Sequence, residues 1–174
     1  MAQFFKPQKK STQPQRIEFT IDSLDHHCVG VGRHQGKAIF VEGALPGELI
    51  KARIVDDKKH YAHAALQQIV TPAANRIAPF CSHYRECGGC SAQHLGEADQ
   101  QAVKEAGLVS LFERLGNIKA PALEPVLKGE SRAYRRVCRL AIKFDKNGRC
   151  TRVGFRRRQS NDLVEVAGCP VLAD

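Results

Sequence analysis

The residues FCSHYRECGGCSAQH, numbers 80–94, hold three of the seven cysteines of this 174-residue chain. Cys81, Cys87 and Cys90 have the spacing C-x5-C-x2-C, and two glycines separate the last pair. Glycines allow a backbone to wrap closely around a bulky group. Three thiolates this close together are poor neighbours unless a cation lies between them. The stretch therefore predicts a metal centre.

A fourth ligand is expected elsewhere in the chain. Cys169 is the best candidate because it precedes Pro170, as a terminal Cys-Pro does in bacterial ferredoxins. The x5 spacing and the Gly-Gly bridge favour a [4Fe–4S] cluster over a single metal ion.

Two other interpretations of the cysteines remain open. Zinc is the rival metal, with His83 or His94 completing a Cys3His set. A dithiol redox pair at Cys87 and Cys90 is the other, but it leaves Cys81 unexplained and lacks a surrounding βαβ pattern. Structural roles are predicted for the remaining three cysteines, as small buried hydrophobes: Cys28, Cys138 and Cys150.

On the N-terminal side of the cysteines, residues 17–70 read as short strands. Ile17, Phe19 and Ile21 alternate with polar residues, and similar runs occupy 38–41, 49–54 and 61–70. Four or five strands with Gly-rich turns predict a small OB-like barrel, a common platform for nucleic acids. The run CVGVGRHQGK is not a dinucleotide-binding loop, because the third glycine and the following helix are missing.

On the C-terminal side, residues 97–116 predict an amphipathic helix. Its apolar stripe has helical spacing and is expected to be core: Leu108, Leu111, Phe112 and Leu115. A second β segment follows, in which alternate residues from Cys138 to Phe144 are apolar. Asn147-Gly148 marks a hairpin turn.

The fold class that follows is α+β and β-rich. We divide the chain into a basic arm (1–16), an OB-like barrel (17–70), a cysteine-rich module (71–96), a helix (97–116) and the start of a further β domain (117–174).

Charge is concentrated at the C-terminal end. The formal net charge is +9, and residues 131–174 carry eleven basic and four acidic residues. Nine of the eleven are arginines, which suit bidentate phosphate contact and stacking on bases. An RNA-binding role is predicted for seven of them: Arg132, Arg135, Arg136, Arg139, Arg156, Arg157 and Arg158.

The sequence shows no sign of export or membrane insertion. No run approaches the roughly 18 apolar residues of a membrane helix, and the N-terminus lacks the apolar segment of a secretory signal. A cytoplasmic protein with reduced cysteines and no membrane or obligate protein partner is expected.

Taken in order, several motifs resemble one family. They are GVGRHQGKAIFVEGALPGE, FCSHYRECGGCSAQH, YRRVCRLAIKF, VGFRRR and AGCP. Together they are similar to the N-terminal part of bacterial 23S rRNA (uracil-C5)-methyltransferases of the RlmD type. The resemblance implies a TRAM domain, which is an OB-like RNA-binding barrel, at about 17–70. It also implies a [4Fe–4S] cluster on four cysteines: Cys81, Cys87, Cys90 and Cys169.

The same resemblance implies a central domain that contacts 23S rRNA through its arginines. The family's catalytic domain, which uses S-adenosyl-L-methionine to make 5-methyluridine, should follow this region. No catalytic residue can be assigned in these 174 residues, and the chain is expected to be a truncated, inactive part of the enzyme. The alternative is a stand-alone iron–sulfur or zinc RNA-binding protein without catalytic activity.

Overall fold

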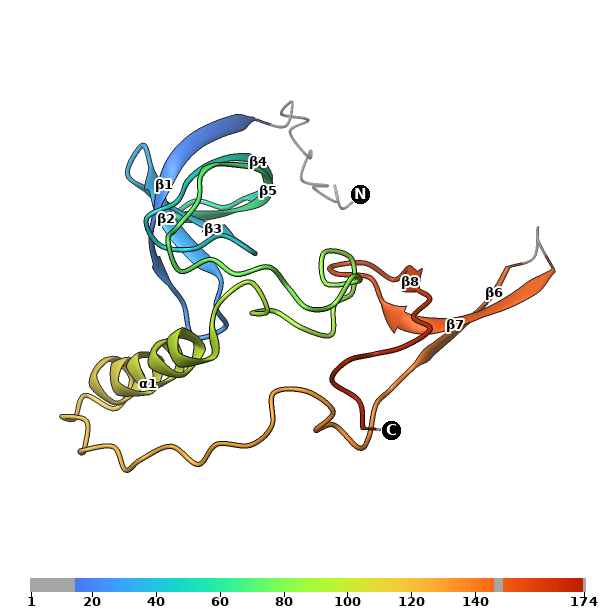
Figure 1. The fold of residues 1–174 in the computed structure, drawn as a ribbon. Helices are drawn as coiled ribbons and strands as arrows, with labels where there is room; N and C mark the ends of the chain where they lie inside the picture. Colours follow the sequence, from blue (N-terminus) through green and yellow to red (C-terminus); the bar gives the residue numbers. More distant parts are fainter. Residues whose placement is uncertain (1–14, 146–148, 174) are drawn as a thin grey trace, which may run out of the picture.

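Five strands near the N-terminus close into a small barrel (Figure 1). The computed structural model describes residues 15–145 and 149–173, so the predicted arm lies almost entirely outside the described residues. The barrel strands are β1 (Arg16–Leu24), β2 (Gly30–His34), β3 (Lys37–Val41), β4 (Leu49–Asp57) and β5 (Tyr61–Thr71).

The barrel closes in the order β1-β2-β3-β5-β4, with β1 and β4 completing the circle. Only the β3–β5 pair is parallel among these neighbours. Alternate residues point inward, as the period of two requires, so Ile17, Phe19 and Ile21 are buried with Ile39 and Ile50. The predicted OB-like barrel is confirmed.

Strand β2 was not expected, because two of its five residues are glycines. The structure explains them by a close approach to β1. A Cβ atom on Gly32 would lie 2.5 Å from the Thr20 carbonyl oxygen and 2.8 Å from the Phe19 ring. A Cβ atom on Gly30 would lie 2.8 Å from the Ala44 carbonyl oxygen. Only glycine fits at these two positions.

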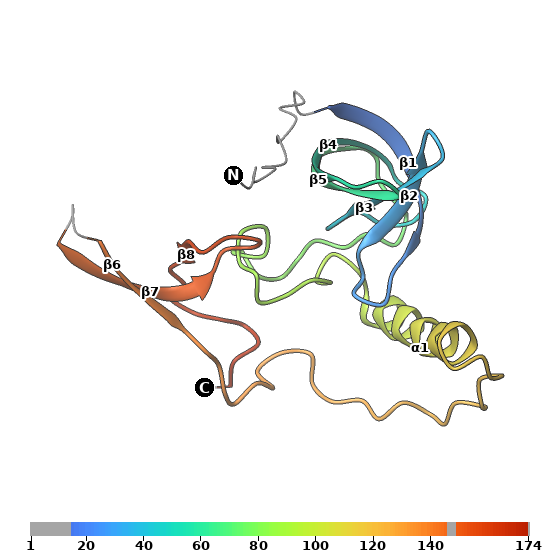
Figure 2. The same cartoon turned by 180° about the vertical axis from the view of Figure 1, so that it is seen from behind.

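The predicted helix is present as α1 (Glu97–Arg114). It lies beside the loop between β1 and β2 (Figures 1 and 2), where a Cβ on Gly107 would be 3.1 Å from the His26 Cβ. The prediction that its stripe is core is wrong for the residues described, since none of α1 is buried and Leu115 is 81% exposed. The periodicity identified the apolar face but not a partner for it.

A second, three-stranded sheet lies at the far end of the molecule (Figure 2). It consists of β6 (Ala141–Asp145), β7 (Cys150–Arg156) and β8 (Leu163–Val164), all antiparallel. The strand predicted from 138 begins three residues later, and the predicted Asn147-Gly148 turn lies outside the described residues. The antiparallel β segment is confirmed.

The structure separates the three cysteines that were predicted to be structural. Cys28 is buried, as expected. Cys138 and Cys150 are both exposed, so the prediction that they are buried is wrong. Cys138 precedes β6 instead of lying on its apolar face, and the side chains that continue that face, Ile142 and Phe144, are themselves exposed.

A buried ion pair ties the barrel to the segment that follows it. The Glu48 carboxylate is fully buried and accepts hydrogen bonds from Arg76 Nε (2.5 Å) and Nη2 (2.8 Å). It also accepts from the backbone N–H groups of Leu45 (2.8 Å) and Ala73 (3.1 Å). Burial favours the neutral carboxyl, but the hydrogen bonds outweigh it, so the pKa of Glu48 is lowered.

Replacing Glu48 with Gln should therefore destabilise the chain strongly. The Arg76 guanidinium would lose its counter-charge, which typically costs about 3–5 kcal/mol for a buried pair. Urea unfolding followed by circular dichroism measures the loss. Because the pKa of Glu48 is lowered in the folded chain, its stabilisation is full above the unfolded pKa and is lost as pH falls. The difference in free energy of unfolding between the wild type and Glu48→Gln should therefore become smaller as the pH falls.

Glu18→Gln is the matched control. Glu18 forms an exposed ion pair with Lys51 at 3.7 Å, and such pairs contribute about 0–1 kcal/mol. Equal unfolding midpoints for Glu48→Gln and Glu18→Gln would contradict the role assigned to the buried pair.

Candidate metal centre

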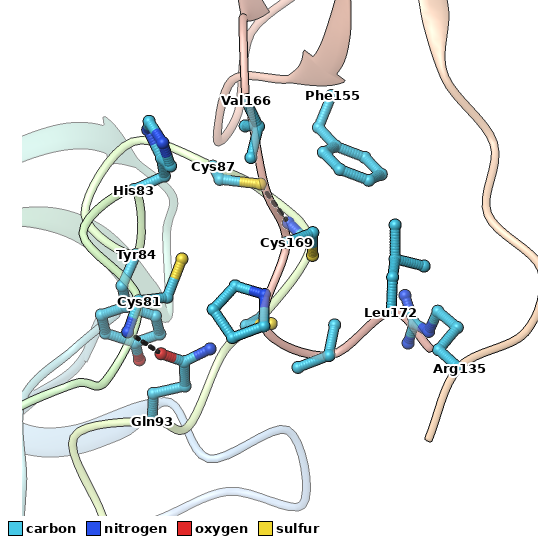
Figure 3. Close-up of a pocket in the computed structure, with 14 residues that line it drawn as sticks. Cys81, His83, Tyr84, Cys87, Gln93, Arg135, Phe155, Val166, Cys169 and Leu172 are labelled. Carbon is cyan, nitrogen blue, oxygen red and sulfur yellow. Dashed lines mark hydrogen bonds between the residues drawn. The ribbon is translucent and has the colours of Figure 1, made fainter. Parts of the chain in front are cut away.

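Four cysteines from two distant segments line one small cavity (Figure 3). Cys81, Cys87 and Cys90 come from the loop between β5 and α1, and Cys169 comes from the segment after β8. All four are half-buried and none forms a disulfide. The remaining lining is mostly apolar and includes Phe155, Val166, Pro170, Val171 and Leu172. The structure thus brings together all four cysteines that were predicted as ligands.

Local turns present the first three thiols to the cavity. The N–H groups of Tyr84 and Cys87 donate to the carbonyls of Cys81 (3.1 Å) and His83 (2.8 Å), so the chain coils between the first two cysteines. The N–H of Gly89 then donates to Cys87 Sγ at 3.4 Å. Such donors to sulfur favour the thiolate form that binds metal.

The Gly-Gly bridge also has a packing role that the sequence did not reveal. Gly88 N–H donates to the Arg156 carbonyl at 3.0 Å, and a Cβ atom at Gly88 would lie 3.2 Å from that oxygen. Cys87 and Arg157 form an isolated antiparallel bridge. The cysteine loop is therefore held against the end of β7.

The fourth cysteine is fixed by a different set of backbone hydrogen bonds. Leu172 N–H donates to the Cys169 carbonyl at 3.0 Å and closes a turn. Arg135 N–H donates to the Val171 carbonyl at 2.8 Å, and Ala173 N–H donates to the Arg135 carbonyl at 3.0 Å. Cys169 thus depends on the chain before β6 as well as on its own segment.

The Arg158 guanidinium links the loop to both of its neighbours. Its Nη2 donates to the Cys90 carbonyl at 2.5 Å, and the carbonyls of Tyr84 and Cys87 lie at 3.4 Å. Its Nη1 pairs with the Glu42 carboxylate of the barrel at 3.1 Å. The cation also lies 5.5 Å from the centre of the Tyr84 ring.

A buried amide has one end committed and the other free beside the cysteines. Gln93 Oε1 accepts from the Cys81 N–H at 3.2 Å, which orients the amide. Gln93 is 7% exposed, and its Nε2 has no hydrogen-bond acceptor among the described residues. Figure 3 shows this side chain pointing into the cavity, on the side of Cys81.

The two histidines considered as zinc ligands lie in different places. His83 lines the cavity, whereas His94 is buried with its Nδ1 2.6 Å from the Tyr84 hydroxyl. That hydroxyl also donates to the Ser91 carbonyl at 2.6 Å. Burial lowers the pKa of His94 to about 4 and raises that of Tyr84 to about 12, so both are neutral near pH 7.

The thiols themselves favour a cation between them. Burial raises the pKa of Cys90, and the nearby Cys169, Cys87 and Cys81 raise it further, whereas the neighbouring Gln93 side chain lowers it. Within residues 15–145 and 149–173, no three Cys, His, Asp or Glu side chains are arranged as a site for a metal ion. That these cysteines bind a metal centre therefore stays a prediction.

Five of the seven predicted RNA-binding arginines already have intramolecular contacts. Arg132 lies 4.6 Å from the centre of the Phe80 ring and Arg135 lies 5.9 Å from that of Tyr134. Arg156 donates to the Asn161 amide oxygen and Arg157 pairs with Glu86, in addition to the Arg158 contacts above. Arg136 and Arg139 are exposed, with no such contact among the described residues.

No helix in the described part of the chain has the length and apolar character of a membrane span.

Comparison with known proteins gives consistent matches. Residues 10–66 match the TRAM domain family. The chain is 90% identical over all 174 residues to the 23S rRNA (uracil(1939)-C(5))-methyltransferases RlmD of Aeromonas salmonicida and Aeromonas hydrophila. It is 52% identical over 172 residues to the RlmD of Tolumonas auensis. The chain spans about 40% of the length of these relatives.

A solved structure also matches. It is the Pyrococcus abyssi tRNA (uracil-54, C5)-methyltransferase in complex with S-adenosyl-L-homocysteine, with a TM-score of 0.58 and 24% identity. The match covers 90% of this chain and 33% of that one, and it supports the fold alone. Over its whole length the chain is therefore similar to part of proteins named RlmD, and its residues 10–66 match the TRAM domain family.

Proposed function

We propose that this chain is the RNA-recognition and cluster-binding part of a 23S rRNA (uracil-C5)-methyltransferase of the cytoplasm. The observation that carries the proposal is the 90% identity, over every residue of the chain, to relatives named for that reaction at uracil 1939. The domain boundaries predicted from the sequence, at 70, 96 and 116, form part of the proposal.

The chemistry of methyl transfer is assigned to the part of the relatives that this chain does not span. S-adenosyl-L-methionine supplies the methyl group there, and no catalytic residue is assigned in these 174 residues. This chain's task is to hold the rRNA so that the target uridine reaches the catalytic domain. Enzymes that modify a base in this way must first take it out of its stack.

The enzyme as a whole can be tested with the full-length protein, which joins this chain to its catalytic domain. We expect transfer of a labelled methyl group from S-adenosyl-L-methionine to 23S rRNA at one uridine, and none from the 174-residue chain alone. Methylation of tRNA instead of 23S rRNA would contradict the assigned substrate. RNA and metal binding without methyl transfer by the full-length protein would favour the stand-alone binding protein.

We further propose that Cys81, Cys87, Cys90 and Cys169 hold a [4Fe–4S] cluster. The donor set suits it, since four thiolates are the usual ligands of such clusters. The cavity they line is largely apolar, and the free Gln93 amide offers an N–H donor toward sulfur. Hydrogen bonds of that kind are a regular feature around cluster sulfurs.

The proposed role of the cluster is structural. It would join residues 81–90 to residue 169, and a link that closes so long a loop restricts the unfolded chain strongly. The loop itself contains no helix or strand between Thr71 and Glu97, so few regular hydrogen bonds hold it in place.

Metal analysis of anaerobically purified protein tests the cluster. We expect about four irons and four sulfides per chain, with visible absorption that oxygen slowly bleaches. Cys169→Ser should lose most of the iron and expose residues 131–173 to proteolysis. Cys138→Ser, which changes an exposed cysteine away from the cavity, should keep both iron and stability. About one zinc without sulfide would favour the zinc-binding alternative.

The basic C-terminal region is proposed to contact the rRNA backbone. Arg136 and Arg139 have exposed guanidinium groups with no partner among the described residues, so they are the clearest candidates. Because each phosphate contact releases counterions, RNA binding should weaken as salt rises.

The double variant Arg136→Gln/Arg139→Gln should weaken binding to a 23S rRNA fragment. The slope of log affinity against log salt should fall by about 1.4–1.8 in magnitude, which corresponds to two lost phosphate contacts. Fluorescence anisotropy over a salt series measures this slope. The control is Arg114→Gln on α1, outside the predicted set. An unchanged slope in the double variant would show that these arginines do not touch phosphate.

A further inference from the structure

Three aromatic rings form a cluster on the outside of the barrel, which we call the aromatic patch. It consists of Phe40 on β3 and of Tyr61 and His63 on β5. The ring centres of Phe40 lie 5.9 Å from Tyr61 and 5.4 Å from His63, and Tyr61 and His63 are 5.5 Å apart. Each ring therefore contacts the other two.

The strand register explains why these rings share one face. In the parallel pair β3–β5, Phe40 is opposite His63, and Ala38 is opposite Tyr61. Their sequence neighbours Ile39 and Ala62 are buried in the barrel core, so the rings point outward. Tyr61 is 40% exposed and His63 is also exposed, so the rings are accessible among the described residues.

One positive charge lies on the β2 side of the patch. Arg33 on β2 is opposite Ala38, so Arg33, Ala38 and Tyr61 form one outward-facing row across three strands. Two strand spacings separate Arg33 from Tyr61, or about 10 Å. The small Ala38 side chain leaves the space between them open.

The second cation comes from the turn between β4 and β5. At the end of β4, before this turn, Asp57 pairs with Lys37, and Asp56, which is opposite His63, pairs with Lys58. Lys59 is exposed, has no partner among the described residues, and lies two residues before Tyr61. The turn thus offers one free cation beside the rings.

We propose that the aromatic patch stacks on an unpaired nucleobase of RNA, with Arg33 and Lys59 contacting the flanking phosphates. Exposed rings beside cations are the combination that single-stranded nucleic acid uses, since every base has a face to stack and every linkage carries a negative charge. An acidic protein partner would use the cations but gain little from three rings. Paired bases in a duplex are already stacked and cannot reach the patch.

This inference deepens the proposed RNA-binding function and rests on it. It assigns particular residues, and a stacking role, to the RNA contact that a TRAM barrel is expected to make, separate from the arginines of residues 132–158. The chemistry of the two regions also differs. The arginines are proposed to bind phosphate charge, whereas the aromatic patch would bind a base that is not paired.

The test compares an unstructured single-stranded RNA with a blunt RNA duplex of the same length, using the 174-residue chain and fluorescence anisotropy. Tyr61→Leu should weaken single-strand binding about 5- to 100-fold, the equivalent of one lost base stack of about 1–3 kcal/mol. Duplex binding and the salt slope should stay as in the wild type. Tyr61→Phe keeps the ring and should bind like the wild type.

Two further variants separate stacking from charge. Arg33→Gln should lower the magnitude of the single-strand salt slope by about 0.7, one phosphate contact. Phe144→Leu, which removes an exposed aromatic ring on β6 outside the barrel and outside the predicted RNA-binding set, should leave single-strand binding unchanged. Melting temperatures establish that Tyr61→Leu remains folded.

The outcomes distinguish the patch from the wider proposal. If the wild type binds RNA and Tyr61→Leu binds single strands equally well, the patch inference is wrong and the proposed function stands. Equal loss of single-strand and duplex binding would also overturn it, because the ring would then act through the barrel's structure. If the wild-type chain binds no RNA even at low salt, the proposed RNA-recognition role fails and the patch fails with it.

Discussion

The Arg158 guanidinium is the contact on which the arrangement of the whole chain depends. It neutralises Glu42 of the barrel, donates to the carbonyl of Cys90 and lies over Tyr84. Residue 158 itself follows β7, so one side chain joins the barrel, the cysteine loop and the second sheet. Because charge-assisted hydrogen bonds are stronger than neutral ones, this contact can orient a loop that has no regular secondary structure.

The cavity lined by the four cysteines matters both for the fold and for the proposed metal binding. Its walls come from segments that are far apart in the sequence, so a group bound by four thiolates would link them as well as occupy the cavity. The Tyr84–His94 pair behind the loop is neutral near pH 7, because burial moves both pKa values away from that range. Arg158 contacts the loop through three backbone carbonyls, and Arg157 pairs with Glu86 of the same loop. At the proposed metal site, the negative thiolates would be stabilised by the metal and by N–H donors.

Much of the fold and of the candidate site was predictable from the spacing of the cysteines and the alternation of apolar and polar residues, but not all of it was. The cysteine spacing selected three of the four residues that the structure brings together, the Cys-Pro pair selected Cys169, and alternation found most barrel strands. Strand β2 was missed because glycine carries no β propensity, although closeness to Phe19 and Thr20 requires it. Cys138 and the α1 stripe were predicted to be buried because periodicity reports which face is apolar and says nothing of what covers it. The aromatic patch was missed since its rings meet only through the parallel β3–β5 register.

The close approach at Gly32 has a consequence for how this barrel can evolve. Any larger residue there would meet the Thr20 carbonyl, which belongs to the backbone and cannot rotate away. The outward row next to it is under no such restriction, because Arg33 and Tyr61 face solvent and do not pack in the core. Substitutions can therefore accumulate on the outer face of the barrel while the close contact between β1 and β2 at Gly32 stays unchanged. One barrel can thus acquire different nucleic-acid preferences among descendants without any change in its closure.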